Sequence, residues 1–322
     1  MSADVNSDYD ALLMGRLFLL FLMSGFLCWG EPQTVTIRST VDGAEQKALL
    51  AVPESAKEKP TPLVVHLHSW SSDYKNSSKM EEAIDAAQQQ GWIFISPDFR
   101  GPNQRPEACG SDLAVQDVVD AVHYVQSVAK VDQKKIYLLG GSGGGHMSLL
   151  MAGRHPELWR AVSAWVPISD LADWHRSTKE KDLRYWKMLE VCTGGAPRAS
   201  SAIDAEYRKR SPVRWLSRAG KLPIHIEVGI HDGHQGSVPV SQSLRAFNIL
   251  ARFNQKTSEA FSEEEIREIT DNQRVSGKAP EVEEGRRYPA LLRRKAGNAM
   301  ITIFEGGHET DFAIGMKWLA SH

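Results

Sequence analysis

The sequence predicts an α/β fold, with a mostly parallel sheet of about eight strands and helices on both faces. Short apolar runs alternate along the chain with segments of helical spacing, and parallel strands need such crossover helices. A length of 322 residues and a hydrophobic content of 42% suit one large domain, which we place at residues 31–322. The net charge of −2 gives no electrostatic argument for a nucleic-acid partner.

An apolar run near the N-terminus differs from the rest of the chain. Leu17 to Cys28 follows the positive charge of Arg16 and is short for a bilayer span, which needs about 20 residues. This length, the charge and the small residue Gly30 are typical of a secretory signal. We expect residues 1–30 to direct export to the periplasm or the medium. An uncleaved membrane anchor is the alternative, and it is the one reason to expect a membrane partner.

The expected strands are short and apolar, as in sheets that are buried on both faces. They cover residues 35–37, 49–52, 62–68, 92–96, 135–139, 161–166, 223–228 and 299–304. Helical spacing covers residues 80–90 and 113–128, and helix-forming residues resume from His146. Gly91 suits the left-handed position that ends the first of these helices.

Two long stretches interrupt the alternation of strands and helices. Residues 171–215 are charged and aromatic and follow a strand end, where a cap over a functional site would lie. Residues 255–297 are mostly polar and are expected to be a peripheral insertion. Within them Ser262 and Glu265 have the spacing of a capping box, which predicts a helix start.

The strongest local motif is the run from Gly140 to Gly144, a G-x-S-x-G between a predicted strand and a predicted helix. A sharp strand-to-helix turn exposes the Ser142 hydroxyl, and its strained backbone leaves little room for neighbouring side chains. The turn also directs the Gly143 N–H towards a developing oxyanion. A phosphate-binding loop would need lysine where His146 stands. The motif therefore predicts the nucleophile turn of an α/β-hydrolase fold, with Ser142 as nucleophile.

A serine nucleophile needs a base and an orienting acid, which in this fold follow in the order serine, acid, histidine. His308 follows the last expected strand on a turn that contains two glycines, and we predict that it is the base. Asp232 follows the preceding strand and is the predicted acid. Asp170 is the rival acid, but its position suits a helix cap. A surface-loop histidine is the alternative interpretation of His308.

The second oxyanion donor is expected in the loop after the strand at 62–68. The backbone N–H of Trp70 is the predicted donor, beside that of Gly143. Ser69 stands where glycine is more usual, which leaves the donor's identity open. The alternative is a loop that merely carries a packed aromatic residue.

Four further side chains are candidates for substrate binding. Arg100 and Arg105 could grip an acidic group, because guanidinium matches carboxylate geometry. They could equally tie down a long loop. Trp165 and Trp174 lie where a substrate pocket would be lined, although packing beneath a cap is the commoner use of such aromatics.

Cys109 and Cys192 are the two cysteines downstream of the expected signal. An even count in an exported protein permits one disulfide, and two buried thiols are the alternative. No cysteine or histidine spacing resembles a zinc site. The sequence implies no metal, nucleotide or flavin cofactor.

Together these motifs resemble the catalytic domain of the prolyl oligopeptidase family within the α/β-hydrolases. The resemblance covers roughly residues 45–320. Its specific parts are the Gly140–Gly145 run, Asp98-Phe-Arg-Gly101, Gly229-x-x-Asp232 leading to Val238-Pro239, and Glu305-Gly-Gly-His308. By this resemblance Ser142, Asp232 and His308 take the family's catalytic roles.

The sequence departs from the family in two loops and in its architecture. The family's peptidases carry a propeller in front of the catalytic domain, for which we expect no room here. The acid loop is longer than usual, and the oxyanion loop lacks His-Gly-Gly. We therefore expect an esterase-like member that cleaves a small-molecule or polysaccharide ester, with peptidase or acyl-aminoacyl hydrolase as the alternative. An inactive scaffold used for binding is a further alternative.

Overall fold

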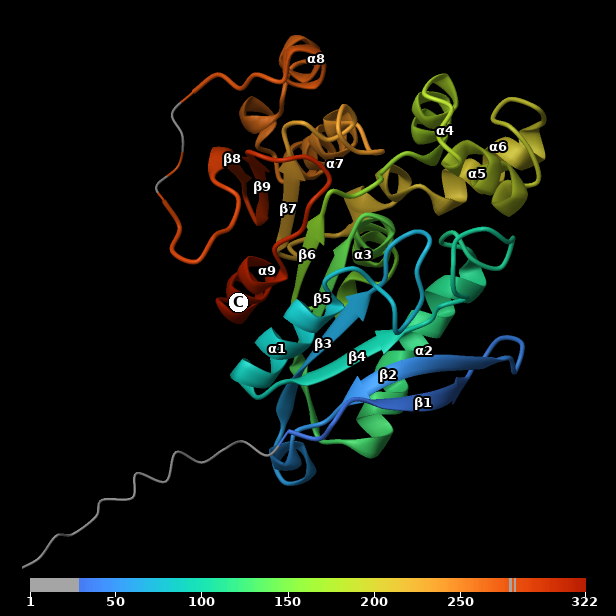
Figure 1. Cartoon of the computed structure of the whole chain (residues 1–322), viewed down its shortest axis with the longest axis vertical. Coiled ribbons are helices and arrows are strands. Elements are labelled where there is room, and N and C mark those ends of the chain that lie inside the picture. Colours follow the sequence, from blue (N-terminus) through green and yellow to red (C-terminus); the bar gives the residue numbers. More distant parts are fainter. Residues whose placement is uncertain (1–28, 278–279, 281) are drawn as a thin grey trace, which may run out of the picture.

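Nine strands make up the central sheet of the computed structural model, which describes residues 29–277, 280 and 282–322 (Figure 1). They are β1 (Gln33–Arg38), β2 (Glu45–Ala51), β3 (Thr61–Leu67), β4 (Ile93–Pro97), β5 (Val131–Gly141), β6 (Ala161–Trp165), β7 (Ile224–Gly229), β8 (Ala290–Ala296) and β9 (Ala299–Phe304). Their order is β1-β2-β4-β3-β5-β6-β7-β9-β8. The six central strands, β4, β3, β5, β6, β7 and β9, run parallel to one another. Antiparallel pairing joins β1 and β2 at one edge and β8 at the other. The predicted α/β fold is confirmed.

The described helices are α1 (Met80–Gln90), α2 (Asp112–Val128), α3 (Gly143–Arg154), α4 (Leu171–Glu180), α5 (Tyr185–Thr193), α6 (Ser201–Arg210), α7 (Val240–Phe253), α8 (Glu263–Asn272) and α9 (Phe312–Ala320). Local chemistry sets several of their ends. Gly91 ends α1 at φ 65°. The Ser111 side chain accepts a hydrogen bond from Ala114 N at the start of α2. At α8 the Ser262 hydroxyl and the Glu265 carboxylate form the predicted capping box.

The helices cover both faces of the sheet. α1 and α9 pack together on one face, whereas α2, α3 and α7 lie behind the sheet in the view of Figure 1. The predicted cap stretch, residues 171–215, contains α4, α5 and α6, which pack against one another beside the sheet. In the described part of the chain, no helix is both long and apolar enough to cross a membrane. The expected signal or anchor lies outside the described residues, apart from Trp29 and Gly30.

One strand was not predicted. β8 lies within residues 255–297, the stretch expected to be a peripheral insertion, and it forms the edge of the sheet beside β9. Arg293, Arg294 and Lys295 interrupt its apolar pattern. An edge strand tolerates such charges because one of its sides is not paired. The sheet therefore has nine strands instead of about eight.

The parallel strands place several loops at one edge of the sheet. The loops after β3, β5, β7 and β9 carry Trp70, Ser142, Asp232 and His308 in turn. Ligands of open α/β sheets bind beyond the carboxyl ends of the strands. The fold therefore gathers the predicted functional residues on a single rim.

Candidate active site

Ser142 occupies a strained turn between β5 and α3. Its φ of 58° and ψ of −117° lie outside the regions that L-residues prefer. The neighbouring positions must be glycine because the backbone approaches them too closely for any side chain. A β-carbon on Gly144 would lie 1.9 Å from Leu67 O, and one on Gly140 would lie 2.4 Å from Gly144 O. The G-x-S-x-G pattern therefore reflects close backbone packing, which fixes the direction of the serine hydroxyl.

Ser142, His308 and Asp232 form a continuous hydrogen-bonded chain. Ser142 Oγ lies 2.8 Å from His308 Nε2, and His308 Nδ1 lies 2.7 Å from Asp232 Oδ2. With the imidazole proton on Nδ1, the ring donates to Asp232 and leaves Nε2 free to accept the serine proton. The geometry has the order and distances of a nucleophile, a base and an orienting carboxylate.

The Asp232 carboxylate is buried and held by the backbone of its own loop. Its Oδ1 accepts hydrogen bonds from Gly233 N at 2.8 Å and Val238 N at 3.2 Å, which leaves Oδ2 for the histidine. The longer loop to Val238 thus folds back onto the acid. Burial alone would lower the pKa of His308, but the charge of Asp232 and its hydrogen bond outweigh burial and raise that pKa.

The acid and base loops pack against each other backbone to backbone. His231 N donates to Gly306 O at 2.8 Å. A β-carbon on Gly229 would lie 2.1 Å from Gly307 O. No side chain larger than hydrogen fits between the two loops, so the separation of Asp232 and His308 is fixed by main chain.

The two predicted oxyanion donors lie close together. A β-carbon on Gly143 would stand 2.3 Å from Trp70 N. Gly143 is the first residue of α3, so its N–H has no partner within the helix. Among the described residues, neither this N–H nor that of Trp70 donates to another backbone carbonyl outside the helices and strands. Both amides are therefore available beside Ser142.

Asp170 is a helix cap, as its position indicated. Its Oδ1 accepts from Ala172 N and Asp173 N at the start of α4. Asp170 does not take part in the hydrogen-bonded chain of Ser142, whose carboxylate is that of Asp232.

The prediction that Arg100 binds substrate is wrong, whereas that for the exposed Arg105 stays a prediction. Arg100 is buried, and its guanidinium forms ion pairs with Asp117 at 2.6 Å and Asp42 at 2.7 Å. Arg105 donates through Nε to Arg100 O at 2.9 Å. Two carboxylates already occupy Arg100, and Arg105 fixes the turn next to it. Both residues tie down the loop after β4, which was the alternative interpretation.

The prediction that Trp165 and Trp174 line a substrate pocket is also wrong. Trp165 is fully buried on β6, and its indole donates to Ser163 Oγ. Trp174 on α4 donates to Ser237 O at 2.8 Å. Its ring packs edge-on against Trp70, with centroids 4.7 Å apart. Trp174 therefore supports the oxyanion loop from behind and is not exposed to a ligand.

Cys109 and Cys192 are bonded to each other in the structure. The bond joins the loop after β4 to α5 of the cap. Lys181, at the end of α4, adds a second tether because its ammonium donates to Gly233 O on the acid loop. The cap is thus attached to the loops on both sides of Ser142.

A cleft of about 440 Å³ opens at Ser142 and His308. Many hydroxyl side chains line its wall, together with the amide of Asn76 and the apolar Trp70, Val166 and Phe312. The wall residues that the sequence did not single out are Ser71, Ser72, Asn76, Ser78, Lys79, Val166, Tyr185, Glu309, Thr310 and Phe312. They come from the loop after β3, from the cap and from the segment after His308. No sequence motif joins these segments, so the sequence did not identify them as parts of one wall.

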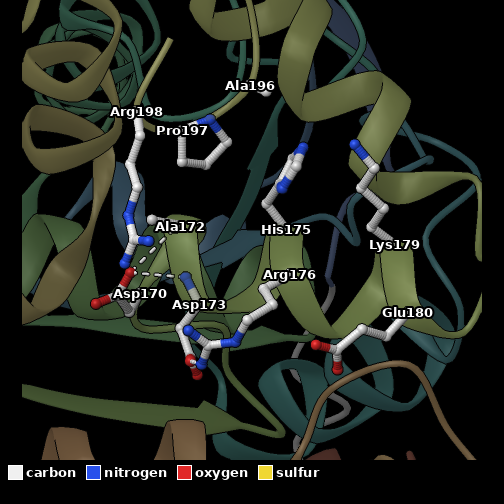
Figure 2. Close-up of a pocket in the computed structure, with 10 residues that line it drawn as sticks. All are labelled: Asp170, Ala172, Asp173, His175, Arg176, Lys179, Glu180, Ala196, Pro197 and Arg198. Atoms are coloured by element: carbon white, nitrogen blue, oxygen red, sulfur yellow. Dashed lines mark hydrogen bonds and ion pairs between the residues drawn. The ribbon is translucent and has the colours of Figure 1, made fainter. Parts of the chain in front are cut away.

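A second cleft of about 580 Å³ lies on the cap, and Figure 2 shows its wall. Acidic and basic side chains alternate there, namely Asp170, Asp173, Glu180, Arg176, Lys179 and Arg198. Arg176 and Asp173 pair with each other. None of the Ser142, His308 and Asp232 side chains lines this cleft. Among the described residues, no group of three or more histidine, cysteine or carboxylate side chains could hold a metal ion.

The model of the prolyl oligopeptidase family matches residues 79–265, which is more than half of the chain and includes Ser142 and Asp232. The chain belongs to this family. It is a serine hydrolase, as the family and the relatives described below indicate. The resemblance predicted from the motifs is confirmed.

Curated relatives include enzymes of two kinds. The acylamino-acid-releasing enzyme of Homo sapiens is 30% identical over 165 residues, which are 47% of this chain and 21% of that enzyme. That of Sus scrofa is 24% identical over 246 residues, covering 70% and 32%. S-formylglutathione hydrolase of Rattus norvegicus is 26% identical over 226 residues, covering 61% and 80%. The chain thus spans about a fifth to a third of the acylamino-acid-releasing enzymes it matches.

Solved structures share the fold at low sequence identity. The acylaminoacyl peptidase of Pyrococcus horikoshii has a TM-score of 0.55 and 20% identity, over 69% of this chain and 35% of that one. A puromycin-hydrolyzing peptidase of Mycobacterium tuberculosis has a TM-score of 0.59 and 18% identity, over 89% and 38%. These peptidases therefore support the α/β-hydrolase fold of this family member.

Proposed function

We propose that this serine hydrolase cleaves carboxylic esters through an acyl-enzyme, with Ser142, His308 and Asp232 as its catalytic triad. The observation that carries the proposal is the hydrogen-bonded chain from Ser142 Oγ through the imidazole to the buried Asp232 carboxylate. In this chain the His308 imidazole, as base, contacts the serine hydroxyl, and the Asp232 carboxylate contacts the imidazole.

The reaction follows from this geometry in two steps. Ser142 Oγ forms a bond to the carbonyl carbon while its proton passes to His308 Nε2. The N–H groups of Gly143 and Trp70 stabilise the oxyanion. The bond to the leaving group then breaks, and His308 returns the proton to the departing oxygen. Water, deprotonated by His308, then attacks the acyl carbon, the bond to Ser142 Oγ breaks, and His308 returns the proton to Ser142 as the acid is released.

Two observations favour an ester over a peptide. The cleft at Ser142 carries many hydroxyl side chains beside the apolar Trp70, Val166 and Phe312, which suits small acyl or alcohol groups, including acylated carbohydrates. Two relatives that are matched over 80% of their own length are named for hydrolysis of S-formylglutathione, which is a thioester. Acylaminoacyl peptidase activity is the second candidate, because six of the matched relatives are acylamino-acid-releasing enzymes.

The test is a comparison of initial rates for purified protein on aryl acetate, feruloyl ester, acetylalanyl anilide and a proline-containing peptide anilide. Ester turnover should exceed anilide turnover, and Ser142→Ala should lower it by about 10³- to 10⁶-fold. Serine-dependent anilide cleavage at comparable rates would replace the proposal with the second candidate. Turnover that survives Ser142→Ala, or absent labelling of Ser142 by a fluorophosphonate, would contradict both.

A further inference from the structure

Lys79 is the lysine in the wall of the Ser142 cleft. Its ammonium donates to Thr310 O at 2.9 Å and lies 3.4 Å from the Tyr288 hydroxyl. The Tyr288 ring centroid lies 5.5 Å from the same nitrogen. Lys79 is half-buried, so these contacts hold the charge at a defined place on the wall.

That place is next to the nucleophile. The Thr310 methyl carbon lies over Gly141, where a β-carbon would approach it to 2.5 Å. Gly141 directly precedes Ser142. A cation bonded to the Thr310 carbonyl therefore shares the cleft with the attacking oxygen of Ser142.

The charge of Lys79 is not neutralised within the described part of the chain. Both oxygens that it contacts are uncharged, and no carboxylate there forms an ion pair with it. Glu309 is the acidic residue of the same wall. Its Oε2 is buried, and a β-carbon on Gly306 would lie 3.1 Å from that oxygen. One oxygen of Glu309 thus faces the Gly306–Gly307 turn instead of Lys79.

We propose that Lys79 makes this site selective for substrates that carry a carboxylate close to the scissile bond. The inference rests on the proposed function, and it names the substrate class of the same site. A partly desolvated ammonium with a free donor favours a carboxylate by a charge-assisted hydrogen bond. The surrounding Ser71, Ser78 and Asn76 supply uncharged polar groups for the rest of such a substrate. The carboxylate can belong to the acyl group or to the leaving group.

Two matched pairs of esters distinguish a carboxylate on the acyl group from one on the leaving group. Mono-4-nitrophenyl glutarate and 4-nitrophenyl pentanoate differ at the end of the acyl chain. The acetates of 4-hydroxybenzoic acid and of its methyl ester differ in the leaving group. Each pair is measured, with the rate in the absence of protein subtracted, on wild type, Lys79→Met and Lys79→Arg. Lys75→Met is the matched control, because Lys75 is exposed and does not line the cleft.

Lys79→Met should lower kcat/KM for the carboxylate member of one pair by about five- to tenfold, and for neutral members by less than about twofold. Lys79→Arg should retain the preference, Lys75→Met should leave it unchanged, and added salt should weaken it. The pair that responds identifies the side of the bond that carries the carboxylate. Equal effects of Lys79→Met on charged and neutral esters in both pairs would overturn the inference.

A binding measurement separates the inference from the proposed catalysis. Mono-4-nitrophenyl glutarate and the acetate of 4-hydroxybenzoic acid are titrated calorimetrically into Ser142→Ala, with and without Lys79→Met. Weaker binding of one of them in the double variant, by about fivefold, would support the role of Lys79 even if no ester were hydrolysed. If wild type hydrolysed esters and the double variant bound both carboxylate esters unchanged, the proposed role of Lys79 would be refuted. The proposed function would then remain intact.

Discussion

The backbone nitrogen of Trp70 lies against the bare α-carbon of Gly143, 2.3 Å from the position that a β-carbon would take. The two residues come from loops after different strands, and each offers an N–H beside Ser142. A side chain at position 143 would push the two amides apart. Their proximity thus depends on one glycine.

Gly143→Ala should therefore impair catalysis without unfolding the protein. Loss of one oxyanion donor lowers kcat by about 10²- to 10³-fold, and we expect a fall of that size in ester turnover. Gly43→Ala is the control, since Gly43 has φ 71° but no atom within 4 Å of a β-carbon. That variant should lose about 1 kcal/mol of stability and keep its activity. An active Gly143→Ala protein would contradict the assignment of these donors.

The pH profile should report the interaction of His308 with Asp232. His308 must be neutral to accept the serine proton, so kcat/KM should rise as the pH increases through its pKa. Because Asp232 raises that pKa, the acid limb should lie above the ordinary histidine value of 6.5. In Asp232→Asn, burial acts without the compensating charge, so the limb should move to lower pH while the plateau falls by about 10⁴-fold.

His231 provides the control for this profile. Its pKa is also raised, by hydrogen bonds to Glu305 and Gln273. It lies outside the hydrogen-bonded chain of Ser142, so His231→Gln should leave the acid limb in place. A limb that follows His231, or one that does not move in Asp232→Asn, would show that another group governs the profile.

The bond between Cys109 and Cys192 should stabilise the oxidised protein. It closes a loop with a sequence separation of 83 residues, and native disulfides of this kind contribute about 2–5 kcal/mol. Urea unfolding of wild type should shift to lower denaturant in the presence of reductant by an equivalent amount. The Cys109→Ser/Cys192→Ser double variant should unfold at that lower midpoint with or without reductant. Identical midpoints for all four measurements would show that the bond contributes nothing.

A buried ion pair beneath the acid loop should be essential to the fold. Glu227 on β7 is fully buried and accepts two hydrogen bonds from Arg286, at 2.7 and 3.1 Å. Arg286→Met would leave that carboxylate with only the His225 imidazole, 3.1 Å away, at a cost of about 3–5 kcal/mol in the free energy of unfolding. The exposed pair of Arg245 and Glu263 is the control, and Arg245→Met should cost less than about 1 kcal/mol.

The sign of the pH effect on the Arg286→Met variant follows from burial. Burial raises the pKa of Glu227 to about 7 even with Arg286 in place. Without the arginine the pKa rises further, so the folded state binds more protons than the unfolded one above pH ~4.5. The variant should therefore lose stability as the pH rises from about 5 to 8, and Glu227→Gln should remove this dependence. An Arg286→Met variant whose stability did not change with pH over this range would contradict the role of Glu227.

The sequence predicted the elements whose causes are local. The strand from Ala299 to Phe304 and the helix from Met80 to Gln90 have the predicted bounds, because apolar spacing and a left-handed glycine mark them. The hydrogen-bonded chain of Ser142 was also foreseeable, since each member follows a parallel strand and such strand ends meet at one edge. β8 was missed because three basic residues hid its apolar pattern.

The substrate-binding predictions failed for a different reason. The sequence shows that Arg100 and Trp174 lie near the right loops, but it does not show which way their side chains point. Asp42 and Asp117 attract Arg100 away from the rim, and Ser237 O holds the Trp174 indole behind it. Conversely, Lys79 joins the wall only through contacts with residues more than 200 positions away. Long-range contacts of this kind leave no periodic pattern.

The packing of Gly229 against Gly307 bears on how this enzyme could be re-engineered. Random libraries that include the acid and base loops would contain mostly inactive variants. Almost any replacement where the two loops touch would separate Asp232 from His308. Diversity is better placed in residues 71–79 and at Tyr185 of the cap, because side chains there line the cleft outside the hydrogen-bonded chain of Ser142. Because the cleft wall and the catalytic loops are separate, substrate specificity could change during evolution while the hydrolytic chemistry stayed the same.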